Sequence, residues 1–190
     1  MQVLLLGPQG SGKGTQAKRI QSEYDLPHIA TGDILRAAMA NGTPLGRVVK
    51  PIYDAGKLVP DELIIDVIRD RLSQPDADDG FVLDGFPRTL AQAEALDEML
   101  REIGKPLSAV IELHVPREVA VERMLNRSSE EGRSDDTPQA IAKRLELYQK
   151  ETVPVAQHYT GTGNLVRVHG DRSIDEVWAE IQDVLERVVA

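Results

Sequence analysis

One short stretch of the sequence combines residue types that suit the binding of phosphate. The run GPQGSGKGT, from Gly7 to Thr15, places four glycines around Lys13. Glycines allow several backbone N–H groups to approach phosphate oxygens at once, because no side chain blocks them. In the usual phosphate loop a hydroxyl follows the lysine directly, but here Gly14 intervenes before Thr15. We predict a phosphate loop in which Lys13 reaches terminal phosphates and Thr15 lies beside Mg²⁺; the alternative is a glycine-rich turn without a ligand.

An acidic residue, Asp84, ends the apolar run FVLD at Phe81–Asp84. If this run is a strand parallel to the one before the phosphate loop, its carboxylate emerges at the edge of the sheet where ligands collect. A carboxylate there can hold Mg²⁺ directly or through water. A helix N-cap or a turn is the alternative for an isolated aspartate, and the nearby phosphate loop favours the magnesium role.

Six arginines lie near the expected loop edges or on helices that lead into loops: Arg36, Arg88, Arg123, Arg127, Arg133 and Arg144. A single arginine is most often a solvated surface charge, so the prediction depends on the set. Arg123 and Arg127 are four residues apart and share one helical face. The guanidinium fork matches phosphate oxygens. We therefore predict an anionic substrate whose charge these side chains neutralise.

The histidines do not suggest a general base. His28, His114, His158 and His169 are scattered along the chain, and we find no Ser-His-Asp constellation. The first, second and fourth fall in or beside expected strands, where a structural role is favoured. An acceptor that is itself a phosphate is already ionised at neutral pH, so its phosphorylation needs positioning and charge neutralisation only. The pattern of lysine and arginines indicates a kinase of this type.

Alternating strand and helix patterns predict an α/β fold with a parallel sheet of about five strands covered on both faces. Apolar runs predict strands at Gln2–Leu6, His28–Thr31, Phe81–Asp84, Ser108–Val115 and Leu165–His169. Helical periodicity predicts helices at Lys13–Tyr24, Leu90–Ile103, Arg117–Leu125 and from Ser173 to near Val189. Two insertions interrupt this rhythm: Ile34–Leu72 is helical without a strand, and Asn126–Gln139 is polar and predicted to be a surface loop.

Composition and length limit the number of domains and exclude several classes of site and partner. A chain of 190 residues favours one domain. The absence of cysteine excludes disulfides and any cysteine-bound zinc. A net charge of −9 argues against broad binding to nucleic acid. The longest apolar run near the start, VLLL, is too short to cross a membrane, and no signal-peptide pattern accompanies it.

These motifs, taken in order, resemble the adenylate kinase family in its short-lid form. The matching segments are GPQGSGKGTQ (7–16), TGDILR (31–36), GKLVPDE (56–62), DGFPRTLAQAE (84–94) and GRSDDTPQAIAKRL (132–145). The displaced hydroxyl of Thr15 fits, because GKGT is the family's own variant. The resemblance implies reversible transfer of the terminal phosphoryl group of Mg-ATP to AMP, which gives two ADP.

The resemblance also implies a role for each matching residue. ATP phosphates would lie on Gly10, Ser11, Gly12, Lys13, Gly14 and Thr15, facing Arg123 and Arg127, with Arg172 near the adenine. AMP would be lined by Thr31, Arg36, Lys57, Leu58, Val59, Gly85, Phe86, Pro87, Arg88 and Gln92, with Arg36 and Arg88 on its phosphate. Arg133 and Arg144 would close over the reacting phosphates, and Asp84 would act on Mg²⁺ through its waters. The catalytic set would be Lys13, Arg88, Arg123, Arg127, Arg133 and Arg144.

The resemblance further divides the single kinase domain into three parts. Residues 31–60 would be the insertion that binds the nucleoside monophosphate, and residues 127–137 a short lid; the core would comprise 1–30, 61–126 and 138–190. Lid closure, for which this family is a standard example, would keep water from the reacting phosphoryl group. A monomer in the cytoplasm is expected, with no zinc, nucleic acid or membrane partner.

Three other functions remain open at this point. A pyrimidine (UMP/CMP) monophosphate kinase shares the short lid, but tends to have alanine where this chain has Thr31. Gln92 favours AMP, because a primary amide can donate and accept at adjacent positions of adenine. A GTPase-like switch would need an Asn-Lys-x-Asp motif, which does not occur in the sequence. A non-catalytic nucleotide binder would be expected to lack Lys13 or several of the arginines, and none is missing.

Overall fold

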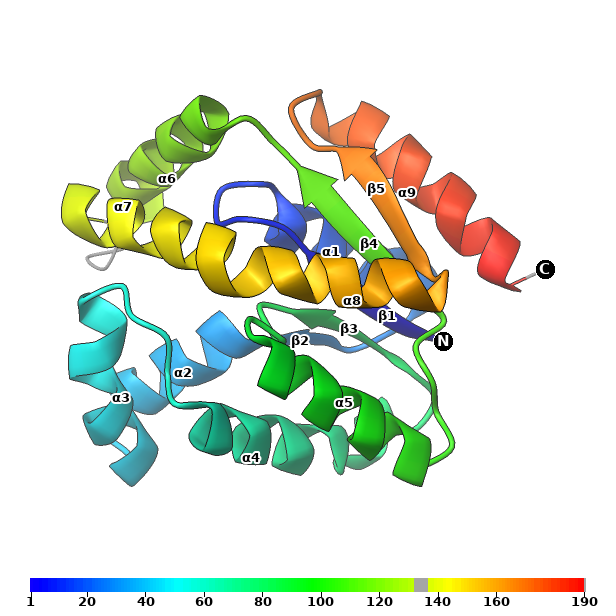
Figure 1. Ribbon diagram of the computed structural model, residues 1–190, viewed down its shortest axis with the longest axis horizontal. Helices are drawn as coiled ribbons and strands as arrows, with labels where there is room; N and C mark the ends of the chain where they lie inside the picture. Colours follow the sequence, from blue (N-terminus) through cyan, green and yellow to red (C-terminus); the bar gives the residue numbers. More distant parts are fainter. Residues whose placement is uncertain (132–136, 190) are drawn as a thin grey trace.

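The computed structural model of the protein describes residues 1–131 and 137–189. Within these residues it contains one five-stranded sheet, made of β1 (Gln2–Leu6), β2 (His28–Ala30), β3 (Phe81–Asp84), β4 (Ala109–His114) and β5 (Leu165–His169). All four strand pairings are parallel, and the order is β2-β3-β1-β4-β5. The predicted α/β class with a parallel sheet of about five strands is confirmed (Figure 1).

The central strand separates two hydrophobic cores because successive side chains point to opposite faces of a sheet. Val3 and Leu5 pack with α1 (Lys13–Tyr24) and α9 (Ile174–Val189). Leu4 and Leu6 pack on the other face. That face is covered by α4 (Asp61–Leu72), α5 (Leu90–Glu102) and α8 (Val153–Thr162). Helices on both faces bury β1, β3 and β4 almost completely, which explains why these strands are continuous apolar runs, whereas β5 lies at the edge of the sheet and is largely exposed.

The first insertion is helical, as predicted. It consists of α2 (Thr31–Ala40) and α3 (Pro44–Asp54), which pack against each other and lead into α4. Thr43 caps α3 by accepting a hydrogen bond from the Gly46 N–H at 3.0 Å. Gly46 lies so close to α2 that a Cβ would be 2.0 Å from the Ala38 carbonyl oxygen. The two helices therefore form a tightly packed lobe beside the sheet (Figure 1).

The prediction for the second insertion was partly wrong. Helix α6 spans Arg117–Glu131, so the first six residues of the predicted loop at Asn126–Gln139 are helical. They are polar but contain no glycine or proline before Gly132, and a solvent-exposed helix can be as polar as a loop. Residues 132–136 lie outside the described structure, and α7 begins at Pro138.

A long helical rod crosses the molecule from α7 (Pro138–Leu147) through a π-helical turn, η2 (Tyr148–Thr152), into α8 (Figure 1). The π turn precedes Pro154, which has no N–H to donate to the carbonyl four residues earlier. The Val153 N–H bonds instead to the Tyr148 carbonyl, five residues back. A short 3-10 helix, η1 (Pro75–Ala77), completes the elements of the described chain.

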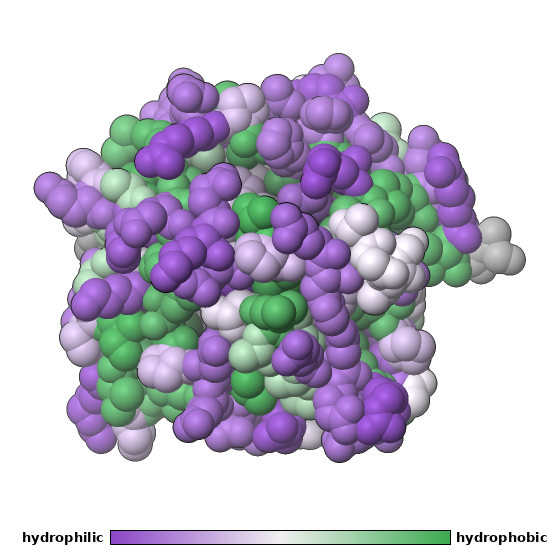
Figure 2. Space-filling view, in the orientation of Figure 1, coloured by the Kyte–Doolittle hydropathy of each residue, from purple (hydrophilic) through white to green (hydrophobic). Residues whose placement is uncertain are grey.

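The surface in the same view is mostly hydrophilic, interrupted by smaller hydrophobic areas (Figure 2). Among the described residues, no helix combines the length and the apolar character that a membrane crossing requires.

Candidate active site

A cleft of about 380 Å³ opens at the carboxyl ends of β1 and β3. Its walls come from the phosphate loop, the α2–α3 lobe, the loop after β3, helix α6 and the helical rod. Ligands collect at this edge in open parallel sheets, and here the edge also gathers cationic side chains. The arginines among them are Arg36, Arg88, Arg123, Arg127 and Arg144.

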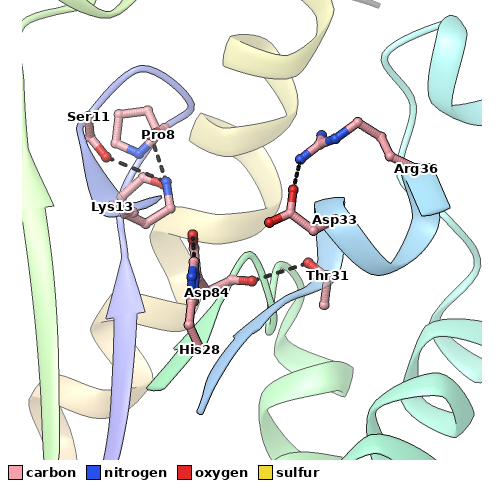
Figure 3. Close-up of polar contacts among 9 residues, drawn as sticks. Pro8, Ser11, Lys13, His28, Thr31, Asp33, Arg36 and Asp84 are labelled. Atoms are coloured by element: carbon pink, nitrogen blue, oxygen red, sulfur yellow. Dashed lines mark hydrogen bonds and ion pairs between the residues drawn. The ribbon is translucent and has the colours of Figure 1, made fainter. Parts of the chain in front are cut away.

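The phosphate loop follows β1 directly and leads into α1. Gly10 has φ +81°, and a Cβ there would be 2.4 Å from the Ala120 carbonyl oxygen, so only glycine fits. Lys13 begins α1 and folds back over the loop, where its Nζ donates to the Gly7 carbonyl oxygen at 2.8 Å. It also donates to the Pro8 carbonyl oxygen at 2.9 Å (Figure 3). The loop thus holds the ammonium group at the positive end of the helix α1, which is the arrangement that binds phosphate.

The surroundings of Lys13 make the protonated form of its amine less favourable than it is in water. Burial lowers its pKa to about 8, and the charges of Arg88 and Arg127 act in the same direction while Asp84 opposes them. An anionic ligand would reverse this effect, because a nearby negative charge favours the protonated amine. Binding of an anion beside Lys13 would therefore raise its pKa again.

Arg123 connects the phosphate loop to the end of β5. Its guanidinium donates to the Gly170 carbonyl oxygen at 2.8 Å and to that of Gly10 at 3.4 Å. Arg127, one helical turn further along α6, also lines the cleft. The four-residue spacing predicts this shared face, and α6 places both guanidinium groups at the cleft beside the phosphate loop.

Asp84 ends β3 next to β1, where Leu5 is its register partner. Burial opposes ionisation of its carboxyl, but the hydrogen bond from His28 and the charge of Lys13 outweigh burial and hold its pKa below the ordinary value. The His28 Nε2 lies 3.4 Å from Asp84 Oδ2 (Figure 3). Thr15, at the end of the phosphate loop, is exposed and lines the same cleft. An ionised carboxylate and a hydroxyl form an oxygen donor set that suits Mg²⁺.

The opposite wall of the cleft is built on the loop after β3, which contains a cis peptide bond between Phe86 and Pro87. Gly85 has φ +84°, and a Cβ there would be 2.5 Å from the Thr31 Oγ1. The Arg88 Nε donates to the Gly85 carbonyl oxygen at 2.7 Å, so the guanidinium is folded over its own loop. Burial, together with the charge of Arg144, lowers the pKa of Arg88, while Tyr53 and Asp84 act in the opposite direction.

Tyr53, on α3, joins two arginines of this wall. Its hydroxyl accepts a hydrogen bond from the Arg36 Nη1 at 2.5 Å. Its ring lies under the Arg144 guanidinium at 5.3 Å, a cation–π contact. Arg36 also forms an ion pair with Asp33 on the same helix (Figure 3). The α2–α3 lobe is thereby connected to the rod through Tyr53.

Most of the residues predicted for the site line this cleft. They are Gly10, Gly12, Lys13, Gly14, Thr15, Arg36, Lys57, Leu58, Asp84, Gly85, Phe86, Pro87, Arg88, Arg123, Arg127 and Arg144. Ser11 and Val59 are buried beside it, and Arg133 lies outside the described residues.

Three further predicted residues, Thr31, Gln92 and Arg172, are not among the described residues that line the cleft, and their nucleotide contacts stay predictions. Gln92 is 2% exposed; its Oε1 accepts from the Arg88 N–H and its Nε2 donates to Asp61, both at 2.7 Å. Thr31 is also 2% exposed, and its hydroxyl donates to the Asp84 carbonyl oxygen at 3.3 Å. Arg172 is exposed, donates to the His169 carbonyl oxygen and pairs with Glu180.

Other cleft residues were missed by sequence reasoning. Tyr53, Asp33, Tyr148 and Thr152 all line it. An isolated tyrosine or threonine in the sequence carries no local sign of a function. The sequence did contain one signal: Arg144, Tyr148 and Thr152 are spaced four residues apart, which places them on one face of a helix.

The comparisons with known proteins agree with this geometry. The family model described as "Adenylate kinase" matches residues 5–164. The adenylate kinase of Stenotrophomonas maltophilia (strain K279a) is 50% identical over 181 residues, covering 95% of this chain and 97% of the relative. The chain belongs to the adenylate kinase family.

Further relatives support the same assignment. The adenylate kinase of Xanthomonas euvesicatoria is 49% identical over 98% of this chain and all of the relative. That of a Cyanothece strain is 48% identical over 98% of this chain and 95% of the relative. The predicted adenylate kinase activity is confirmed by this similarity over nearly the full length, and the alternatives of a pyrimidine kinase or a non-catalytic binder are not favoured.

Proposed function

We propose that the cleft carries out reversible phosphoryl transfer between Mg-ATP and AMP, with the donor on the phosphate-loop side. Gly10, Ser11, Gly12, Lys13, Gly14 and Thr15 would hold the phosphates of ATP through backbone N–H groups and the ammonium. The hydrogen bonds of Lys13 to the loop carbonyls support this, because they keep the amine where a terminal phosphate would arrive. Arg123 and Arg127 would cover the same phosphates from α6.

AMP would bind on the opposite side, with its phosphate on Arg36 and Arg88. Lys57, Leu58, Gly85, Phe86 and Pro87 would line the rest of this half, and all of them lie on the cleft wall. The family resemblance places Thr31, Val59 and Gln92 in the AMP site as well. The hydrogen bonds of Thr31 to the Asp84 carbonyl oxygen and of Gln92 to the Arg88 N–H would also hold the backbone of this half. The adenine contact of Gln92 and the donor-adenine contact of Arg172 stay predictions from the family resemblance.

The observation that carries this proposal is the convergence of cations from five separate segments on one cleft. Lys13 comes from the phosphate loop, Arg36 from α2, Arg88 from the loop after β3, and the others from α6 and α7. The AMP phosphate is ionised at neutral pH and needs no general base. Preorganised positive charge around a transferring phosphoryl group lowers the barrier most where its negative charge develops, so this set can supply the catalysis.

Asp84 and Thr15 would hold Mg²⁺, with Asp84 acting through the water shell of the ion. When bound, the ion would neutralise phosphate charge and help to fix the geometry of the donor. The depressed pKa of Asp84 supports this role, since it keeps the carboxylate ionised.

We also propose that residues 31–60 and 127–137 act as the acceptor-binding insertion and the lid. The contacts of Tyr53 with Arg144 support a coupling of the insertion to the rod. A monomer is proposed because the exposed large hydrophobic residues are spread over α3, α5, α6, β5 and α9. The cytoplasmic setting expected from the sequence stays a prediction.

Transfer from Mg-ATP and Mg-GTP to AMP, CMP, UMP and GMP, followed by phosphorus NMR, tests the proposal. We expect strong preference for AMP as acceptor, and the comparison of Mg-ATP with Mg-GTP measures how strictly the donor base is recognised. Preference for CMP or UMP would leave the arginine roles intact and overturn the acceptor assignment. No transfer to any acceptor would overturn the roles of the arginines as well.

A further inference from the structure

Thr152 makes a hydrogen bond that ordinary helix chemistry does not explain. Threonines inside helices usually donate to a carbonyl three or four residues earlier. Thr160 and Thr162 do this, with bonds of 2.9 Å to Ala156 and 2.8 Å to Tyr159. The Thr152 hydroxyl instead leaves its helix and donates to the Arg88 carbonyl oxygen at 2.8 Å, 64 residues away in the sequence.

The position of Thr152 in the rod accounts for this direction. Thr152 closes the π-helical turn η2 and immediately precedes α8, whose second residue is Pro154. The missing N–H of Pro154 breaks the regular ladder here, and such π turns often occur at functional positions. The result is a threonine that is 8% exposed and lies on the cleft wall, on the same face of the rod as Arg144.

Both main-chain groups of Arg88 are held by side chains, one from Gln92 four residues later and the other from Thr152, which is distant in the sequence. Gln92 accepts from its N–H at 2.7 Å, and Thr152 donates to its carbonyl at 2.8 Å. Gln92 is itself fixed by Asp61 at 2.7 Å, and Asp61 also accepts from Thr89 at 3.0 Å. With its Nε on the Gly85 carbonyl, Arg88 has little freedom left in its backbone or at the base of its guanidinium.

From this arrangement we infer that Thr152 is a positioning residue for the AMP phosphate. It fixes the carbonyl of Arg88, and it ties the acceptor loop to the helical rod that bears Arg144. The inference rests on the proposed role of Arg88 at the AMP phosphate. A small displacement of the Arg88 guanidinium would weaken its contact with the AMP phosphate strongly, because such contacts depend on distance and direction.

The test compares four variants by steady-state kinetics with each nucleotide varied in turn. Thr152→Val keeps the shape and removes the hydroxyl, and Thr152→Ser keeps the hydroxyl. Thr160→Val is the matched control, since its hydroxyl bonds within its own helix. Arg88→Ala provides the reference for loss of the guanidinium.

We expect Thr152→Val to raise the KM for AMP about fivefold, the effect of one net hydrogen bond, and to change the KM for ATP less than about twofold. Thr152→Ser and Thr160→Val should stay within about twofold of the unmodified enzyme for both nucleotides. Equal increases for AMP and ATP, or a serine variant as impaired as the valine variant, would overturn the inference, because a merely structural role would produce either result.

A double variant separates this inference from the proposed function. If Thr152 acts through Arg88, Thr152→Val should add no further increase in the KM for AMP once Arg88 is alanine. Additive effects would overturn the inference and leave the role of Arg88 standing. An Arg88→Ala variant without any selective loss for AMP would overturn both.

Discussion

In the donor half of the cleft, Lys13 bonds to the carbonyl oxygens of Gly7 and Pro8, six and five residues earlier in the chain. In the acceptor half, Arg88 depends on Gln92 and on Thr152, which is 64 residues away. The phosphate loop of the first half is therefore held largely by bonds within one continuous stretch, although Arg123 from α6 also donates to its Gly10 carbonyl oxygen. The second is assembled from the α2–α3 lobe, the loop after β3, the start of α4 and the helical rod.

This difference determines how each half responds to change. A loop whose hydrogen bonds are mostly local should keep its shape as long as β1, α1 and the neighbouring helix α6 are in place. A site held by hydrogen bonds between distant segments is disturbed by any shift of one segment against another. We therefore expect donor binding to be affected by substitutions within the loop, and acceptor binding by substitutions far from AMP as well as near it.

Replacing Lys13 with methionine should have the largest effect, because it removes the only lysine of the phosphate loop. We expect kcat to fall by about 10²- to 10³-fold, the range found when one preorganised charge donor is lost at a reacting centre. A coupled assay of ADP formation measures this, with circular dichroism to verify the fold. Lys150→Met, at an exposed position on η2, is the control. Near-normal turnover would refute the phosphate role of Lys13.

Replacing Arg88 with alanine should show the asymmetry of the two halves most directly. Loss of a charged hydrogen bond to phosphate costs about 1.5–3 kcal/mol, so the KM for AMP should rise by about 10- to 100-fold. The KM for ATP should change by less than about threefold. Arg69→Ala, on the exposed side of α4, is the control. An equal rise for both nucleotides would contradict the assignment of Arg88 to the acceptor half.

Glycine-to-alanine substitutions compare the packing of the two halves. Gly12 and Gly85 both have positive φ, of 95° and 84°, so alanine should cost about 1–2 kcal/mol at either site. Only Gly85 has a neighbour in the way, the Thr31 Oγ1 at 2.5 Å, whereas a Cβ at Gly12 would meet nothing within 4 Å. Urea unfolding should therefore show the larger loss of stability for Gly85→Ala. Equal losses would mean that the acceptor loop adapts more easily than its contacts suggest.

Replacing Arg172 with alanine should have the smallest effect. Its side chain pairs with Glu180 on α9 and lies away from the cleft wall, although the family resemblance assigns it to the donor adenine. Exposed ion pairs contribute little, so we expect the KM for ATP to change less than about twofold. A tenfold or larger rise, measured at saturating AMP, would show that the side chain reaches the donor nucleotide.

The sequence by itself determined the features that depend on neighbours along the chain. The spacing of glycines around Lys13, the apolar run before it and the helix after it are all local, and each is where the pattern predicted. Asp84 could also be placed, because a residue that ends a parallel strand must emerge at the ligand-binding edge. Arg123 and Arg127 followed from helical spacing alone.

Only the tertiary structure decided which side chains hold the acceptor half and where α6 ends. The polar residues after Leu125 fit an exposed helix as well as a loop, so composition could not separate the two. Gln92, Thr152 and Tyr53 have ordinary helical surroundings in the sequence, and their partners are brought near by packing of segments far apart. His114 and His169, scattered in the sequence, likewise become register partners on β4 and β5. Hydrogen bonds across such separations leave no trace in local periodicity, because they form only after the sheet and the helical rod are in place.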